Sequence, residues 1–265
     1  MSEVFSRLLR VMPLPLDARE TERGCYRYYL NYDLQPISEP WIKAQTSDGH
    51  MIVHSARFVD ALNCAILVSY KTDMCKTAAD NPAVYQTDAD RQASSPSGSF
   101  LSQIHWQQAG QDISAIYQFD ANERQLTIER LQNGKTQTHQ AQRSDNFLYF
   151  PLMRVFSGEV ITHLASHGPQ STLVPDINHP SSVDALLRPT ESLRSAEKLD
   201  AEILPLADIH CQTHKYRYLS ERYQQQDDAA FWIDETGLLV KYCWQQNPEA
   251  FWMVELVEHI VSAQT

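Results

Sequence analysis

The sequence predicts a mainly β protein of the α+β class, in which a curved antiparallel sheet or half-barrel packs on one main helix. Short runs of aromatic and β-branched residues recur along the chain, and turn-forming residues separate them. Only residues 151–167 combine a longer apolar pattern with helical spacing. We expect a single domain over residues 1–265, with a long loop or a possible internal boundary at 76–99, where Thr, Ala, Asp, Gln, Ser and Pro dominate.

The first part of the chain is expected to hold one short helix and several strands. Residues 2–12 are predicted to form a helix that stops before Pro13 and Pro15. The pair Asp48-Gly49 is a strong signal for a hairpin turn. The expected strands are 25–34, 41–45, 50–59 and 61–70, the last with a possible helical turn at its start.

A second meander and the main helix follow the long loop. Gly168-Pro169 is typical of a helix end, which places the end of the main helix at His167. A short helix is predicted at 181–187, and residues 190–215 have no single period, with a strand entering near Asp208. The four predicted strands of this meander are 100–107, 112–119, 126–131 and 135–142.

The last part of the chain has the most regular β pattern, with a third antiparallel meander. The acidic turn 234–237 ends in a glycine, and Asn247-Pro248-Glu249 marks the next chain reversal. Side chains alternate along a strand, so the predicted strand 238–244 has one strongly aromatic face. That face holds Leu238, Val240, Tyr242 and Trp244, and the other holds Leu239, Lys241 and Cys243.

Charge and cysteine usage exclude several functions. The formal net charge is −11, with no visible cluster of Lys and Arg, which opposes nucleic acid or an anionic membrane as partner. No apolar run approaches the roughly 20 residues of a membrane span. Arg7 and Arg10 interrupt what would have to be a signal core, and five cysteines without CxxC spacing fit a reducing compartment. We therefore expect a cytoplasmic protein.

Glu159, His163 and His167 are the candidate catalytic residues, because spacings of four place them along one stripe of the main helix. The two histidines fall within the apolar arc of that helix, where an imidazole needs a partner. One interpretation is a metal site or an acid/base pair at the base of a pocket. The alternative is that each ring bonds a neighbouring carbonyl or sits near the helix end. We expect no stoichiometric metal.

Aromatic residues gather in the second and third meanders and near the main helix. They can pack the sheet on the helix, or they can line a cavity that holds an apolar small molecule. The candidate ligand-binding residues are Trp106, Tyr117, Phe119, Phe156, Tyr216, Tyr218, Trp232, Tyr242 and Trp244. No nucleotide-binding loop or hydrolase elbow is present, and we expect no cofactor.

The stretches FLYFPLMRVFSGEVI and FWIDETGLLVKYCW, with the closing strand that follows, resemble bacterial lipoprotein-carrier-like (LolA/LolB-type) half-barrels and the families built like them. The resemblance covers about residues 100–258 and carries over no functional residue. It implies a curved antiparallel sheet around a helix with an apolar cavity, used to carry acyl chains and, in at least one pigment pathway, as a cofactor-free enzyme. The chain departs from the secreted carriers in its odd number of cysteines and in having no predicted signal.

Two functions follow as hypotheses. The first is a cytoplasmic protein that binds a hydrophobic small molecule or acyl chain in an aromatic-lined cavity. The alternative is a cofactor-independent enzyme of small-molecule or natural-product biosynthesis, such as a cyclase or isomerase, with His163 and His167 as acid/base groups. The sequence leaves the oligomeric state open.

Overall fold

The structure is a computed structural model that describes residues 2–73, 98–108, 110–143, 147–177, 184–206, 209–220 and 229–262. Nearly all of the predicted loop at 76–99 lies outside these residues. The first half of the strand sequence is β1 (Arg19–Leu30), β2 (Asp33–Gln45), β3 (His50–Val59), β4 (Cys64–Asp73), β5 (Phe100–Gln108), β6 (Gln111–Asp120), β7 (Gln125–Gln132) and β8 (Lys135–Gln142). The second half is β9 (Leu148–Tyr149), β10 (Gln170–Pro175), β11 (Pro189–Leu206), β12 (Ile209–Ser220), β13 (Ala230–Asp234), β14 (Leu239–Asn247) and β15 (Ala250–Val261).

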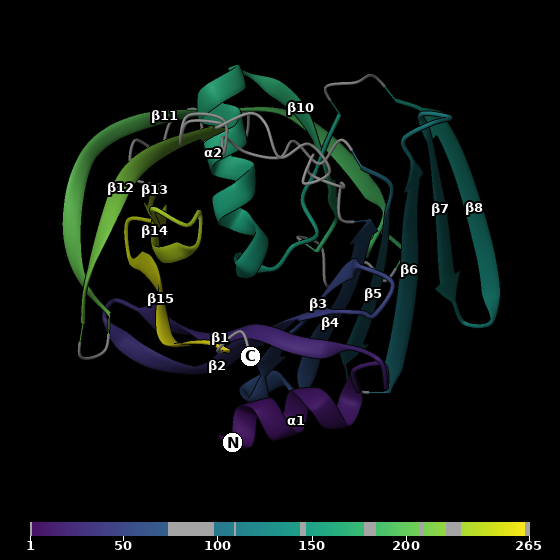
Figure 1. Cartoon of the computed structure of the whole chain (residues 1–265), viewed down its shortest axis with the longest axis horizontal. Coiled ribbons are helices and arrows are strands. Elements are labelled where there is room, and N and C mark those ends of the chain that lie inside the picture. The colour runs from purple at the N-terminus through teal and green to yellow at the C-terminus, as the bar shows by residue number, and fades with distance from the viewer. Residues whose placement is uncertain are drawn as a thin grey trace, which may run out of the picture.

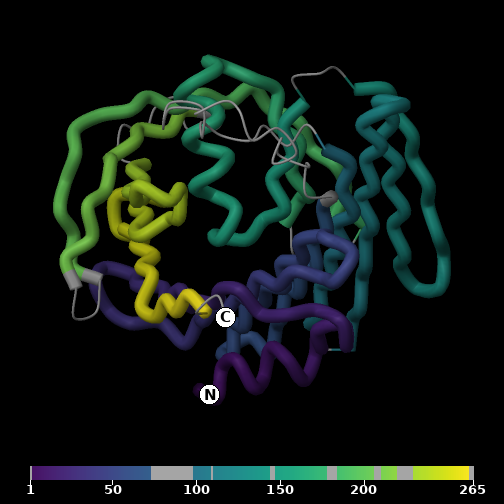
Figure 2. The backbone as a smooth tube through the Cα atoms, in the orientation of Figure 1, coloured from purple at the N-terminus to yellow at the C-terminus, as the bar shows by residue number. Residues whose placement is uncertain are grey.

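The strands form one continuous sheet of 15 strands, in the order β8-β7-β6-β5-β4-β3-β2-β1-β15-β14-β13-β12-β11-β10-β9. The predicted meanders are therefore parts of one sheet, joined where β1 pairs antiparallel with β15. Figure 2 shows this junction as the purple N-terminal strand beside the yellow C-terminal one. The described pairs are antiparallel except β9 with β10. The sheet is strongly curved, as the sequence predicted (Figure 1).

The two α-helices of the described residues lie on opposite faces of the sheet. The helix α2 (Ser157–His167) lies within the curve, and its Val160, Ile161 and Leu164 belong to the same buried core as the inner side chains of the sheet (Figure 1). The helix α1 (Glu3–Val11) packs on the outer face of β2 and β3 through the fully buried Phe5 and Leu8.

The two ends of the sheet approach each other and are joined by side chains. Tyr117 on β6 donates its hydroxyl to the carbonyl of Leu187 over 2.7 Å. Arg130 on β7 donates from Nε to the carbonyl of Leu186 over 2.7 Å. We call this junction, between β6–β8 and the segment 184–191, the seam. Because side chains rather than a strand ladder close it, polar groups gather there.

The main helix begins later than the sequence predicts. A 3-10 turn (Arg154–Phe156) precedes α2, and Leu152 has a φ of 70°, which a helix cannot contain. Side chains of the neighbouring strands hold this loop out of helical geometry: Arg57 donates to the carbonyl of Leu152 over 3.0 Å, and the backbone N–H of Arg154 donates to Glu39. Local apolar periodicity alone contains no trace of these partners.

Three other expectations need correction. The predicted strand 25–34 contains a turn at Asn31 and Tyr32, both of which have positive φ, so that β1 and β2 form a hairpin. Residues 190–215 hold a long hairpin of β11 and β12. Side chains of β11 are mostly exposed, so its sequence lacks the apolar alternation that marks a half-buried strand. The described part of the predicted helix at 181–187 is a turn, and residues 181–183 lie outside the described residues.

Candidate functional site

A ladder of stacked aromatic rings lies on the inner face of β13, β14 and β15. The ring of Phe231 stacks on Tyr242 with centroids 4.1 Å apart, and Tyr242 stacks on Trp244 at 4.7 Å. Trp244 stacks on Trp252 at 5.7 Å. The sheet register produces this arrangement, since Phe231 pairs with Tyr242 and Trp244 with Trp252 across the strands, while Tyr242 and Trp244 are two residues apart on one strand. We call these four rings the aromatic ladder.

The aromatic ladder changes from buried to accessible along its length. Phe231 and Tyr242 are only 5% and 7% exposed, whereas Trp244 and Trp252 are half-buried. The guanidinium of Arg154 lies over the ladder, 4.8 Å from the Tyr242 centroid and 6.0 Å from that of Trp244. A cation at this position is attracted by the negative faces of both rings.

A buried ion pair holds the loop that carries Arg154. The side chain of Glu39 on β2 is completely buried and accepts from Arg57 Nε on β3 over 2.7 Å. The Tyr28 hydroxyl on β1 donates to the same carboxylate over 2.5 Å, and the Arg154 backbone N–H donates to its other oxygen. Burial alone would lower the pKa of Arg57, but the Glu39 carboxylate raises it, so Arg57 stays charged. Removing one partner of such a pair typically costs about 3–5 kcal/mol.

Glu39, Arg57 and Arg154 are not among the residues that the sequence predicts for a site. The one available signal was an acidic residue at an inward-facing position of a strand, but the strand was predicted to begin at residue 41 rather than at Asp33. The three charges come from separate elements, so their proximity is visible only once β2, β3 and the loop before α2 are packed together.

A second group of aromatic rings occupies the other side of the interior. Tyr149 stacks on Phe100 at 4.8 Å and on Tyr117 at 5.4 Å, and Tyr70 meets Phe156 edge-on at 5.1 Å. The predicted ligand-binding residues of this part are all buried members of the main core: Trp106, Tyr117, Phe119 and Phe156. Tyr216 and Tyr218 on β12 belong to the same core.

Trp232 lies apart from the other predicted aromatic residues. It packs with Cys243 and Met253 in a separate cluster on the outer face, where its Nε1 donates to Glu202 over 2.7 Å. Its neighbours Phe231 and Ile233 face the main core instead. A register shift between Trp232 and Ile233 also turns Leu239 into that core, contrary to the predicted alternation of the strand.

The stripe of α2 has local partners for both histidines. His163 is 6% exposed, and its Nε2 lies 3.0 Å from Oε1 of Gln170. The ring of His167 stacks on that of His163 at 4.1 Å, and its Nδ1 lies 3.0 Å from the carbonyl of His163. Burial lowers the pKa of His163, which favours the neutral ring. Among the described residues, no group of three or more His, Cys, Asp and Glu side chains could hold a metal ion.

Part of the Glu159 side chain is exposed to water. The protein around its carboxyl nevertheless raises the pKa of that group by desolvation, and the charge of Lys43 opposes this with a smaller effect. No hydrogen bond joins the Glu159 carboxyl to either histidine ring among the described residues.

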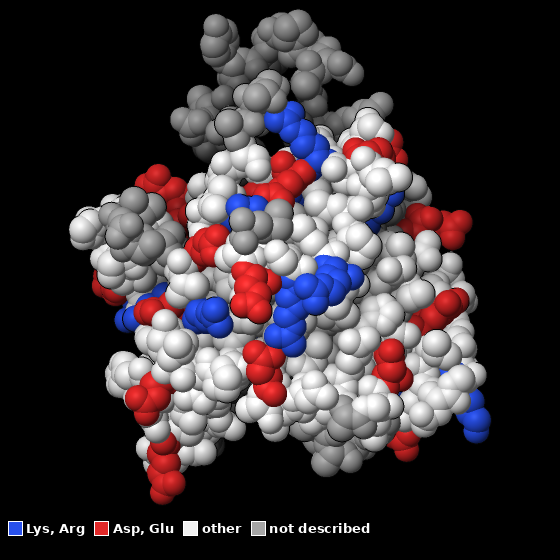
Figure 3. Space-filling model, turned by 90° about the horizontal axis from the view of Figure 1, so that it is seen from below, with Lys and Arg blue, Asp and Glu red and all other residues white. Residues whose placement is uncertain are grey.

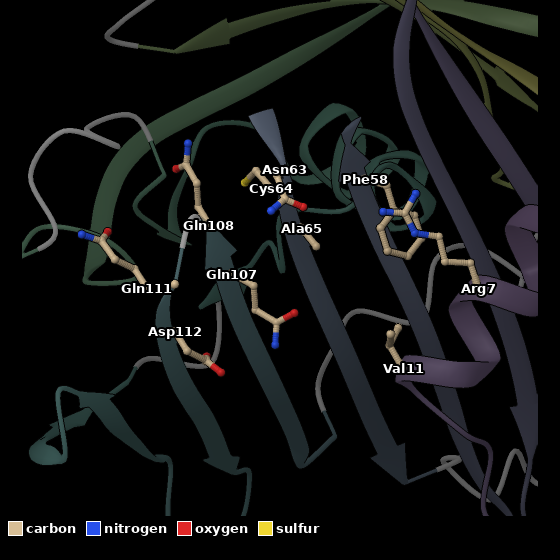
Figure 4. A pocket seen from close by; sticks show the side chains of 11 residues that line it. Arg7, Val11, Phe58, Asn63, Cys64, Ala65, Gln107, Gln108, Gln111 and Asp112 are labelled. Carbon is tan, nitrogen blue, oxygen red and sulfur yellow. The ribbon is translucent and has the colours of Figure 1, made fainter. Parts of the chain in front are cut away.

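A groove lined by both polar and apolar residues lies on the outer face beside α1, with a volume of about 420 Å³. Figure 4 shows Arg7 of α1 beside Phe58 at one side and Gln107, Gln111 and Asp112 of β5 and β6 at the other. Arg7 is already paired with Asp60 at 2.7 Å and lies 3.8 Å from the Phe58 centroid. None of the residues that line the groove belongs to the aromatic ladder, so the two are separate.

The surface around α1 carries mixed charge. Figure 3 shows acidic and basic side chains interspersed on this face, without a broad area of positive charge. No helix among the described residues is long and apolar enough to cross a membrane. Of the five cysteines, Cys25, Cys64, Cys211 and Cys243 are free, and Cys75 lies outside the described residues.

Comparisons with known proteins complete the description of the site. Neither a family model nor a curated protein matches this sequence. Among solved structures, the chain is similar to the crystal structure of a β-barrel-like protein of the domain of unknown function DUF1849 from Brucella abortus. The two are 10% identical with a TM-score of 0.48, and the similarity covers 92% of this chain and 98% of the other. The resemblance to lipoprotein-carrier-like half-barrels stays a prediction.

Proposed function

We propose that the protein binds a hydrophobic small molecule or acyl chain against the aromatic ladder in the interior of the curved sheet. The observation that carries the proposal is the pair of half-buried, stacked rings of Trp244 and Trp252 at the accessible end of an otherwise buried ladder. An apolar ligand that covers these rings removes their remaining apolar surface from water, which stabilises the complex.

Arg154 gives this proposed ligand a second feature. Its Nε is buried and has no hydrogen-bond partner among the described residues, and its guanidinium is held over Tyr242 and Trp244. A buried donor without a partner costs free energy, which a ligand oxygen can recover. The ligand class that fits is therefore an apolar molecule with a carbonyl, hydroxyl or carboxylate oxygen near one end.

Binding of Nile red, an uncharged apolar dye whose emission rises in apolar surroundings, tests this proposal. Replacing Trp244 with Leu keeps an apolar residue but removes the stacked ring. We expect the dye to bind roughly fivefold more weakly, since an aromatic contact contributes about 1 kcal/mol beyond area burial.

Trp232→Leu is the matched control, because Trp232 lies on the opposite face of the same part of the sheet. Dye affinity of this variant should equal that of the wild type. Equal weakening in both variants, or an unchanged affinity in Trp244→Leu, contradicts binding at the ladder.

The alternative function is a cofactor-independent enzyme with His163 and His167 as acid/base groups. The supporting observation is His163 Nδ1, which has no hydrogen-bond partner among the described residues. His163→Gln separates the two functions. A binder keeps its ligand affinity, whereas an enzyme keeps ligand affinity but loses turnover by roughly a hundredfold or more, because Gln cannot exchange a proton.

A further inference from the structure

A pocket of about 570 Å³ opens at the seam, within the size range of small-molecule sites. Its walls come from β7 and β8 on one side and from the start of β11 on the other. The lining residues that matter for charge are Arg130, Arg143, Arg188, His139 and Glu191. Three arginines around one pocket contrast with the formal net charge of −11 of the whole chain.

The fold fixes Arg130 in the wall of the pocket, near the charge of Arg188. Arg130 is 4% exposed and is fixed by the hydrogen bond from its Nε to the carbonyl of Leu186. Burial lowers the pKa of Arg130, and the nearby charge of Arg188 lowers it further, while Asp184 acts in the opposite direction. The charges of Arg130 and Arg188 thus repel each other, and an anion bound by Arg188 relieves this repulsion.

The carboxylate in the lining does not neutralise the pocket. Glu191 pairs with Nη1 of Arg143, but Nε of that arginine is buried without a hydrogen-bond partner among the described residues. The side chain of Arg188 is exposed at the rim, and within the described part of the chain no ion pair or hydrogen bond occupies it. Donors of a kind that binds oxyanions are therefore available on Arg143 and Arg188.

We propose that the seam pocket binds the oxyanion group, a carboxylate or a phosphate, of a small organic molecule between Arg188 and Arg143. Arg130 contributes its charge from its buried position on β7, and His139 lines the pocket from the neighbouring strand β8. Ile128 and Pro189 add apolar surface to the lining, so the pocket also accommodates a short apolar body attached to the anion. This site shares no residue with the aromatic ladder.

Isothermal titration of the full chain at low ionic strength tests the proposal, with sodium phosphate and sodium butanoate, whose apolar body is short, as separate probes. Binding of phosphate alone identifies a free or esterified phosphate as the ligand chemistry, and binding of butanoate alone identifies a carboxylate. Arg188→Gln should weaken binding of the probe about tenfold or more. The reason is that a hydrogen bond between charged groups contributes at least the free energy that a tenfold change in affinity requires.

Arg10→Gln is the control, because it removes the same charge from an exposed position on α1 far along the chain from the seam. A second variant, His139→Glu, places a carboxylate in the pocket and should abolish binding, whereas His105→Glu makes the same change at an exposed position of β5 and should not. The proposal is overturned if neither probe binds the wild type, or if Arg188→Gln and Arg10→Gln bind alike. Nile red binding should be unaffected by Arg188→Gln, so that a failure here is distinct from a failure at the ladder.

Discussion

Gly158 at the start of α2 touches the backbone of Gly237 in the turn between β13 and β14. A Cβ atom on Gly158 would lie 1.9 Å from the carbonyl oxygen of Gly237, far inside any permitted contact. The turn cannot easily yield, because Asp234 Oδ1 accepts from the backbone N–H groups of Thr236 and Leu238. The first turn of α2 is therefore docked on the sheet by direct backbone contact.

Gly158→Ala should destabilise the protein. In an exposed helix the same change stabilises by up to about 1 kcal/mol, but here the methyl group must displace a rigid backbone, at a cost of about 1–3 kcal/mol. Urea unfolding of the variant and the wild type measures the sign of the change in unfolding free energy. Ser166→Ala, at an exposed position of the same helix, should stay within about 0.5 kcal/mol of the wild type. A stabilised Gly158→Ala variant would show that α2 is not seated on this turn.

Tyr28→Phe should cost about 1.5–3 kcal/mol of unfolding free energy. The change removes the hydrogen bond from the Tyr28 hydroxyl to Glu39 and leaves that oxygen of a buried carboxylate with one donor fewer. Burial raises the pKa of Tyr28 to about 12, which keeps the hydroxyl protonated as a donor. Tyr29→Phe is the matched control, since Tyr29 is partly exposed and belongs to the outer cluster. Similar losses in the two variants would argue against the buried network.

Stability should fall as the pH drops below about 6.5, and His163 should account for part of the fall. Burial lowers the pKa of His163 from its ordinary 6.5, so that below this pH the unfolded chain binds a proton that the folded chain resists. His54, whose pKa is also lowered by burial, acts in the same direction. Thermal unfolding between about pH 7 and about pH 5 covers both sides of the ordinary histidine pKa of about 6.5. Over this range the His163→Gln variant should lose less stability than the wild type. An unchanged pH dependence in that variant, equal to that of the exposed His139→Gln, would rule out a buried neutral His163.

The described cysteines should react slowly in the folded protein. Burial raises the pKa of Cys25 and of Cys243 to about 11, so that few thiolates form near neutral pH. A titration with Ellman's reagent measures the reaction rates of the four described thiols. It uses a Cys75→Ser variant, because Cys75 lies outside the described residues. Cys211, which is partly exposed, should react first, and the other thiols should react only on unfolding. Fast reaction of all four thiols in the native state would contradict the burial of Cys25 and Cys243.

Local sequence patterns by themselves determined most of the strands and their turns. The alternation of apolar residues in β5, β6 and β7 and the turn at Asp48-Gly49 depend only on neighbours along the chain. The aromatic face of β14 was predictable for the same reason, and Tyr242 and Trp244 lie on the inner face as expected. Local patterns did not reveal β11, because a strand with mostly exposed side chains has no apolar period.

Only the tertiary structure decided which residues meet in the interior. Glu39, Arg57 and Arg154 are brought together by the pairing of β2 with β3 and by the loop before α2, and their sequence neighbours give no indication of it. The same holds for the arginines of the seam. The residues of each set are separated along the chain, and the pairing of strands or the approach of the two ends of the sheet brings them within interaction distance.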